Sequence, residues 1–347
     1  HGTYVSQMIV GDDNGAKGLG VAFDAALIGI RRGFGADGST QDTLEGFVHA
    51  RISGADIMNN SWSATAAFGD NKKINFTGTD TSAVIGEIQQ LATIGRDGLG
   101  ASVVFAAGNG RAEGMSANYK NYQNDIHVIS VGAITESGVF ADYSEAGANL
   151  FVVAPGDDIR ASSHLDDGLV YLLSGTSFAA PIVSGVIALM LEANPDLGYR
   201  DVQDILALSA RQIDAEGTGW AGKGWQFNDG AHLNGGGFHF SHDYGFGLVD
   251  ARAAVRLSET WTQQQTSANQ VKTDIFTAAP MLTIPDQGTV TTTIEVTQNI
   301  EIERVIIDLD IAHTWAGDLV VSLIAPSGAE TTLMYRVENG AYQDLYN

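Results

Sequence analysis

Leu173-Ser174-Gly175-Thr176-Ser177-Phe178-Ala179-Ala180-Pro181 forms a glycine-bearing turn that leads into a long apolar run, Ile182 to Leu191. This pattern predicts a buried helix that begins near Thr176. A serine in the first turn of a helix lies where free backbone N–H groups and the positive end of the helix dipole stabilise an oxyanion. We therefore expect Ser177 to be a nucleophile.

The small residues around Ser177 fit this role. Gly175 lets a substrate backbone approach closely, and Ala179 and Ala180 keep the helix face low. Pro181 lacks an N–H group that would have no partner early in the helix. The alternative is that Gly-Thr-Ser merely caps the helix, as serine and threonine commonly do.

Two further stretches support a catalytic role for Ser177. The sequence opens with His1-Gly2-Thr3, and the apolar run Val103 to Ala107 ends in Gly108-Asn109-Gly110. His-Gly-Thr, then Ala-Gly-Asn-Gly, then Gly-Thr-Ser-x-Ala-x-Pro resemble, in that order, the motifs of the subtilisin-like serine proteases. Three separate motifs in the family's order make the resemblance specific.

The resemblance implies a role for each of these residues. His1 would be the general base that takes the proton of the Ser177 hydroxyl group and returns it to the leaving amine. The Asn109 amide and the Ser177 backbone N–H would bind the oxyanion of the tetrahedral intermediate. Taken alone, Asn109 is also compatible with a loop asparagine in a left-handed turn.

In this family the aspartate of the triad precedes the histidine. Asp12 and Asp13 follow His1 in a loop-like Gly-Asp-Asp-Asn-Gly stretch and do not match that order. We therefore expect the chain to be cut at its N-terminal end, ahead of which the aspartate, its strand and a pro-segment would lie. A chain without that aspartate is expected to be an impaired enzyme.

Composition limits the function further. With 41 acidic and 18 basic residues among 347, the formal net charge is −23, which argues against binding to nucleic acids or anionic membranes. The absence of cysteine excludes disulfides and thiolate zinc sites. No uninterrupted apolar run reaches about 18 residues, so we expect no membrane insertion. The charge suits a soluble secreted protein, which we expect to be a monomer.

Residues 1–258 alternate between strand-like and helix-like stretches. The predicted strands are 25–30, 57–61, 102–106, 127–131 and 150–154, and the predicted helices are 42–52, 84–94, 176–192 and 199–209. This order predicts an α/β catalytic domain with a mostly parallel, subtilisin-like sheet flanked by helices. Active residues are then expected at strand ends and helix starts.

Other stretches are similar to the kexin and furin-like branch, among them Tyr199-Arg200-Asp201-Val202-Gln203. Within residues 262–347, period-two alternation predicts strands over 289–296, 300–309, 319–325 and 330–336. His313-Thr314-Trp315-Ala316-Gly317-Asp318 resembles the signature of the P domain, the all-β jelly-roll sandwich that follows kexin-type catalytic domains. We expect this domain to be incomplete at its C-terminal end, and another secreted β-sandwich is the alternative.

The substrate-binding stretches depart from the kexin pattern. Where kexin-like proteases have Ser-Trp-Gly-Pro-x-Asp-Asp and Asn-x-Asp-Gly-Tyr, this chain has Ser61-Trp62-Ser63-Ala64-Thr65-Ala66-Ala67 and Asn118-Tyr119-Lys120-Asn121-Tyr122. A buried arginine without carboxylate partners is costly, so we expect a P1 preference that is not strictly dibasic. Substrate backbone is expected to pair with Ser61, Trp62 and Ser63 and to pass over Gly175.

The resemblance also implies structural calcium. Asp12-Asp13-Asn14-Gly15-Ala16-Lys17-Gly18 lies where the family has a calcium loop, and side-chain and carbonyl oxygens suit a hard cation. We expect ligands from Asn14, Asp12 and the carbonyl groups of Ala16 and Gly18, with a solvated acidic turn as the alternative. A second family site, where Glu145 is kept but Met115 and Ala66 replace aspartates, is not expected to bind metal.

The resemblance thus implies a secreted or cell-surface serine endopeptidase, expected to be bacterial, with protein or peptide substrates and its own upstream pro-segment. Two other functions stay open. An α/β-hydrolase-type esterase needs Gly-x-Ser-x-Gly and a later histidine; residues 175–179 lack the last glycine, although His242 follows. The second open function is that of a catalytically inactive homologue that acts as a binding module.

Overall fold

A four-stranded parallel sheet lies at the centre of the molecule. The computed structural model describes residues 1–13, 18–33, 39–70, 81–162, 170–228, 237–300 and 302–340. The strands follow one another across the sheet in chain order: β1 (Ile57–Asn60), β2 (Ser102–Ala106), β3 (Val128–Ile134) and β4 (Leu150–Pro155). All pairs are parallel, with Ile57 opposite Ser102 and Val103 opposite Val128. Their carboxyl ends therefore meet at one edge of the sheet.

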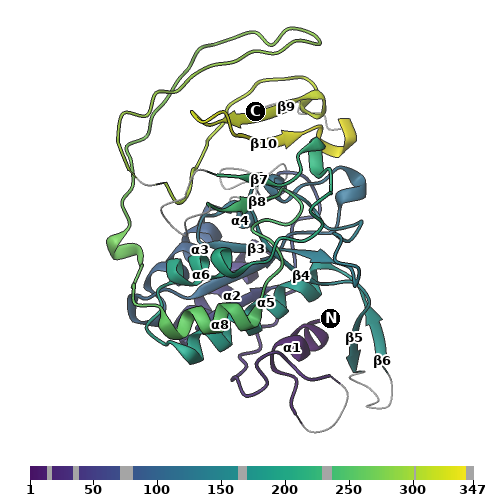
Figure 1. Cartoon of the computed structure of the whole chain (residues 1–347), viewed down its shortest axis with the longest axis vertical. Coiled ribbons are helices and arrows are strands. Elements are labelled where there is room, and N and C mark those ends of the chain that lie inside the picture. Colours follow the sequence, from purple (N-terminus) through teal and green to yellow (C-terminus); the bar gives the residue numbers. More distant parts are fainter. Residues whose placement is uncertain are drawn as a thin grey trace.

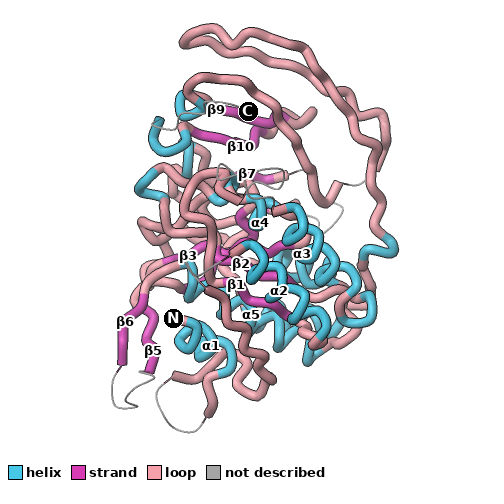
Figure 2. Tube along the Cα trace, turned by 180° about the vertical axis from the view of Figure 1, so that it is seen from behind, coloured by secondary structure: helices cyan, strands magenta, loops and turns pink. Residues whose placement is uncertain are grey.

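Helices cover both faces of this sheet. Val103 and Phe105 of β2 belong to the core formed with α2 (Thr40–Ile52) and α3 (Ser82–Ile94). Val104 and Ala106 point the other way, into the core formed with α5 (Thr176–Ala193), α6 (Tyr199–Ser209) and α8 (Ala251–Thr260). In Figure 1 α8 lies in front of the sheet, and in Figure 2, seen from behind, α2 and α3 do. A strand buried on both faces must be apolar throughout, as Ser102–Ala106 nearly is.

The central helix α5 lies against all four strands and against α1 (Gly2–Val10) and α8. By length and mean hydropathy, 1.6 over 18 residues, it is the one helix of the described chain that would suffice to cross a membrane. It is nevertheless 67% buried inside the fold. Its apolar character is thus explained by its position in the core.

Smaller elements connect these layers. The antiparallel pairs are β5 (Ile159–Ser162) with β6 (Val170–Leu173), β7 (Gln226–Phe227) with β8 (His239–Phe240), and β9 (Val320–Ile324) with β10 (Glu330–Tyr335). The short helices are α4 (Asn121–Asn124), η2 (Arg96–Gly98), η3 (Arg111–Glu113), η4 (Ala117–Tyr119), η5 (Trp220–Gly222), η6 (Ser267–Asn269), η7 (Ala316–Asp318) and η8 (Val337–Gly340).

Most predicted elements of the first 258 residues are confirmed within a few residues, but the strand at 25–30 is wrong. That stretch has no ladder partner, and Leu27 and Ile28 are 55% and 41% exposed. A strand exists only where a neighbour takes its backbone N–H and C=O groups, and β1 is the edge of the described sheet. Helix α1, which directly follows His1, was not predicted.

The strands predicted at 289–296 and 300–309 are also wrong. Their described residues form neither helix nor strand, and side chains such as Ile294 and Ile306 are 49% and 71% exposed. Figure 1 shows this part of the chain as a long loop that runs out from the body and returns. The last two predicted strands are confirmed as β9 and β10, joined by the predicted turn at 326–328.

Strand β10 lies against the loop that follows β2. The hydroxyl of Tyr119 donates to the carbonyl of Tyr335 (3.1 Å) and accepts from its N–H (3.0 Å). Asn118 Nδ2 donates to the carbonyl of Leu333 (2.8 Å), and the Thr332 N–H donates to His242 Nε2 (3.2 Å). Below them, an apolar cluster contains Ala67, Met115, Tyr119 and Val337. The C-terminal strands therefore pack onto the α/β domain through polar and apolar contacts.

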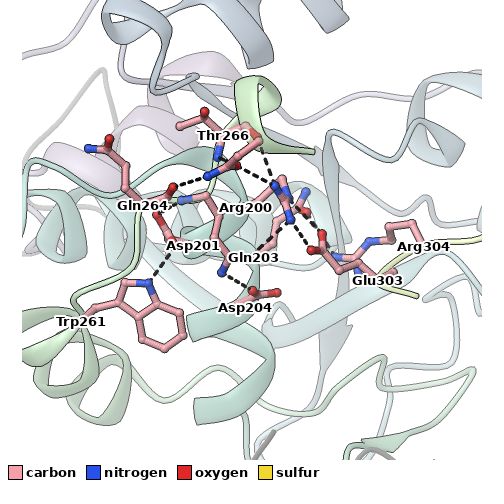
Figure 3. A network of polar contacts seen from close by, with 11 residues as sticks. Arg200, Asp201, Gln203, Asp204, Trp261, Gln264, Thr266, Glu303 and Arg304 are labelled. Atoms are coloured by element: carbon pink, nitrogen blue, oxygen red, sulfur yellow. Dashed lines mark hydrogen bonds and ion pairs between the residues drawn. The ribbon is translucent and has the colours of Figure 1, made fainter. Parts of the chain in front are cut away.

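A second contact between the two parts centres on α6 (Figure 3). Arg200 forms an ion pair with Glu303 and donates to the Thr266 carbonyl at 3.1 Å. The carboxylate of Asp201 accepts from Trp261 Nε1 (2.8 Å) and from the Gln265 N–H (2.9 Å). These bonds hold the segment that follows α8 against the start of α6.

Because of Asp204, which lies in the same network, we expect the free energy of unfolding to depend on pH. Burial raises the pKa of its carboxyl to about 6, although Gln265 Nε2 donates to it at 2.8 Å. The native state then binds more protons than the unfolded state, so its stability falls as the pH rises from about 4 to about 6. Asp204→Asn removes this charge, and we expect it to raise the free energy of unfolding at pH 7.5 by up to about 3 kcal/mol.

Thermal unfolding measured between pH 4 and pH 8 checks this prediction. The gain of Asp204→Asn should vanish near pH 4, where the wild-type carboxyl is protonated. Asp196→Asn, at an exposed position, serves as the control and should leave the pH profile unchanged. A constant offset between Asp204→Asn and wild type at every pH would contradict the assignment.

Candidate active site

The predicted site residues gather where the strands end and α5 begins. Ser61 follows β1, Asn109 follows β2 by three residues, and Ser177 is the second residue of α5. This is the expected arrangement, because ligand-binding groups of open parallel sheets lie at the carboxyl ends of the strands.

Ser177 and Ser61 hold each other through two hydrogen bonds. The Ser61 hydroxyl donates to the Ser177 carbonyl at 2.7 Å, and the Ser177 hydroxyl donates to the Ser61 carbonyl at 3.3 Å. Pro181 explains why this carbonyl is available: in a regular helix the N–H four residues ahead would bind it, and proline has none. Pro181 thus leaves an acceptor that joins the start of α5 to the end of β1.

Asn109 is oriented by Thr176. Its Oδ1 accepts from the Thr176 N–H at 2.9 Å and from the Thr176 hydroxyl at 2.8 Å. The Gly108 N–H in turn donates to that hydroxyl at 3.2 Å. With Oδ1 accepting two donors, the amide is fixed so that Nδ2 points away from Thr176. The sequence pattern indicates Thr176 only as part of a helix cap, so its role in orienting Asn109 was not predicted.

Gly175 leaves open the space beside these donors. A Cβ atom built on Gly175 would lie 3.3 Å from Asn109 Nδ2 and 3.7 Å from Ser177 N. Its φ of +147° is also one that L-residues rarely adopt. Two nitrogen atoms that can donate, Asn109 Nδ2 and Ser177 N, therefore lie within 4 Å of a position that only glycine leaves free.

Tyr143, which the sequence analysis also missed, holds the turn before α5. Its hydroxyl donates to the Gly156 carbonyl (2.7 Å) and accepts from the Gly175 N–H (2.9 Å). Burial raises the pKa of Tyr143, so the phenol stays protonated and keeps its donor. Nothing in the spacing between Tyr143 and Ser177 indicates this contact.

His1 lies at the start of α1, which packs against α5. Its ring centroid is 5.7 Å from that of Phe178, the neighbour of Ser177, with the rings tilted by 49°. In the described part of the chain no hydrogen bond joins the ring to the Ser177 hydroxyl or to a carboxylate. The fold thus brings His1 beside the nucleophile candidate without a direct bond between them.

The arrangement has counterparts among known proteins. The profile of the family described as "Subtilase family" matches residues 1–247, well over half of the chain. The chain belongs to the subtilase family. The profile "Proprotein convertase P-domain" matches residues 302–346.

Over the aligned residues, curated relatives are about one third identical to this subtilase. It is 32% identical to protease KEX1 of Kluyveromyces lactis over 96% of its length and 31% identical to furin of Rattus norvegicus over 93%. It covers 43% and 39% of these two proteins, so it spans less than half of each. The predicted kexin-like subtilase with a P domain is confirmed.

Solved structures confirm the fold. The serine protease of Aeromonas sobria in complex with its chaperone matches 98% of this subtilase and 66% of the protease chain, with a TM-score of 0.78 at 23% identity. The predicted subtilisin-like α/β fold is therefore established for this chain.

The predicted calcium ligands are only partly described. Asn14 and Ala16 lie outside the described residues, Asp12 is exposed, and Gly18 offers a carbonyl group. Among the residues that the structure describes, no cluster of three or more histidine and acidic side chains could hold a metal ion. Asp12 and Gly18 alone supply too few oxygens for the six to eight that calcium takes. The described residues by themselves therefore do not form a calcium site.

The two stretches that differ from the kexin pattern meet at Lys120, which also forms a buried ion pair with Glu145. Lys120 Nζ lies 2.6 Å from Glu145 Oε1, and the two side chains are 1% and 2% exposed. Lys120 Nζ also donates to the Ser63 hydroxyl at 3.3 Å. The Trp62 ring packs against Phe105 and Tyr122 in the core, so only its backbone remains for a substrate.

His242 does not fit the alternative esterase. It is fully buried, its Nε2 accepts from β10, and burial lowers its pKa. The histidine that would have to serve Ser177 in that reaction is thus bound elsewhere.

Gly175→Ala is expected to abolish most activity. The new methyl group would fill the space between the two donors, and losing oxyanion stabilisation costs about 100-fold or more in kcat. The measurement is kcat for a chromogenic peptide amide, with the melting temperature taken in parallel.

Gly138→Ala is the matched control. Gly138 also has a positive φ, +80°, but open space where a Cβ would lie. It should lose stability from backbone strain while keeping its kcat. Equal kcat losses in both variants would show that strain, and not blockage of the donors, explains the effect.

Proposed function

We propose that this subtilase is a serine endopeptidase in which Ser177 attacks the peptide carbonyl. One observation carries the proposal: Asn109 Nδ2 and Ser177 N both lie within 4 Å of the position that Gly175 leaves open. Pre-aligned N–H donors at a developing oxyanion are the largest single contribution in many acyl-transfer enzymes. The relatives named as proteases support the same reaction.

The proposed reaction assigns each proton. Ser177 Oγ attacks the carbonyl carbon as His1 takes the hydroxyl proton, and the oxyanion accepts from Asn109 Nδ2 and Ser177 N. His1 then gives the proton to the leaving amine, and a water activated by His1 hydrolyses the acyl-enzyme.

The substrate is proposed to be an extended peptide. Ser61 to Ser63 leave the carboxyl end of β1 directly beside Ser177, where a peptide backbone can pair with them. We keep residues 1–258 and 262–347 as the proposed catalytic domain and P domain. Structural calcium, a pro-segment and secretion remain proposals that rest on the kinship with kexin and furin.

Covalent labelling tests the nucleophile. The full-length protein should react with a fluorophosphonate probe, and Ser177→Ala should abolish both labelling and hydrolysis. His1→Ala should lower the labelling rate by about 1,000-fold or more, because the base that activates the serine is removed. A correctly folded protein that neither reacts nor hydrolyses peptides would favour an inactive homologue.

A substrate library tests the specificity. Because Lys120 is paired with Glu145 beside Ser63, we expect no preference for arginine or lysine at P1. Comparing kcat/KM across a positional library of peptide amides measures this directly. A preference for P1 arginine of more than about 100-fold, some 3 kcal/mol, would contradict the assignment.

A further inference from the structure

The loop that carries Asn109 is held on both sides by one buried residue, Glu145, through its backbone N–H and its side chain. The Glu145 N–H donates to the Gly108 carbonyl at 3.1 Å, and the Gly110 N–H donates to Glu145 Oε1 at 3.0 Å. Asn109, the only residue between them, is thereby fixed at both of its backbone neighbours. We call these two bonds, with the Lys120–Glu145 ion pair, the Glu145 clasp.

Lys120 completes the clasp. Its ammonium lies 2.6 Å from Glu145 Oε1, the same oxygen that accepts from Gly110. A Cβ atom on Gly108 would lie 2.2 Å from Lys120 Nζ and 2.4 Å from Glu145 Oε1, so the loop backbone rests directly on the pair. Burial raises the pKa of Glu145, whereas the Lys120 ammonium opposes this effect.

The clasp also reaches the proposed substrate strand. Lys120 Nζ donates to the Ser63 hydroxyl at 3.3 Å, while Ser61, two residues earlier, bonds Ser177. Among the described residues, Glu145 Oε2 is buried and has no hydrogen-bond partner. Such a pair is costly to bury, and replacing a buried pair by apolar residues is often neutral for stability. Stability alone therefore does not account for its presence here.

We propose that Lys120 and Glu145 are positioning residues that hold the Asn109 amide in place for the oxyanion. This inference rests on the proposed function, and it goes beyond it by assigning to the pair a role in turnover rather than in P1 binding. Lys120 and Glu145 touch neither the reacting atoms nor the Ser177 hydroxyl in the structure. They act through the backbone at Gly108 and Gly110.

A double-mutant cycle in the full-length protein tests the proposal. Lys120→Met/Glu145→Met removes the pair without leaving an unpaired buried charge, and we expect it to lower kcat about 10- to 100-fold with little change in KM. In wild type, Asn109→Ala should lower kcat about 100- to 1,000-fold. With the pair removed, the same change should cost less than about 10-fold, because the amide is no longer held in position.

Two further variants control for folding and for charge. Arg51→Met/Glu87→Met removes the ion pair between α2 and α3, far from Asn109 in the fold, and should leave kcat unchanged. Glu145→Gln keeps an oxygen that accepts from the Gly110 N–H and should retain more kcat than Glu145→Met. If Lys120→Met/Glu145→Met does not fold, the Asn109 cycle is run in the Lys120→Met/Glu145→Gln background, which removes both charges; there Asn109→Ala should cost less kcat than in wild type.

The outcomes separate the inference from the function. Losses from Asn109→Ala and from the pair that simply multiply would overturn the positioning role, as would a changed KM and P1 preference with kcat intact. Both results presuppose an active wild type that Ser177→Ala inactivates. If wild type itself fails to hydrolyse peptides and to react with the fluorophosphonate, the proposed function falls and this inference falls with it.

Discussion

The two hydrogen bonds from Thr176 to Asn109 Oδ1 join the sheet to the helix. They connect the residue before the nucleophile candidate with the loop that follows β2, as the bonds between Ser61 and Ser177 connect the start of α5 with the end of β1. Because a carboxamide has one acceptor oxygen and one donor nitrogen, fixing the oxygen also fixes where the nitrogen points. The geometry of the donor pair therefore depends on this contact.

Neutral groups hold the chain on one side of that contact, and charged groups hold it on the other. On the helix side the turn is held by neutral partners, the Tyr143 phenol, the Ser61 hydroxyl and the carbonyl that Pro181 leaves free. On the sheet side the loop rests on a buried ion pair. Charge-assisted bonds are shorter and stronger than neutral ones, but they cost desolvation. In this loop the two buried charges lie close together, so each has an opposite charge within hydrogen-bond distance.

Sequence reasoning predicted what depends on local pattern. The helix at 176–193 and the strands at 102–106 and 150–155 follow from periodicity, and Ser177, Asn109 and Ser61 follow from short motifs at strand ends and a helix start. It failed where a strand needs a partner, as at 25–30, since alternation cannot show whether a neighbour is present. It also missed Thr176, Tyr143 and the bond between Lys120 and Glu145, because these contacts join residues brought together only by the fold.

Three of the bonds that hold β10 in place share one property: side chains of the α/β part meet main-chain groups of the strand. Asn118, Tyr119 and His242 bind the backbones of Leu333, Tyr335 and Thr332. Only the backbone of β10 takes part in these three bonds. A strand with the same backbone course and different side chains would therefore form all three. These three bonds thus depend on the tyrosine, the asparagine and the histidine of the α/β part, whereas the side chains of β10 serve other contacts, such as the ion pair of Glu330 with Lys223. The α/β part, not the C-terminal strands, supplies the side chains of these bonds.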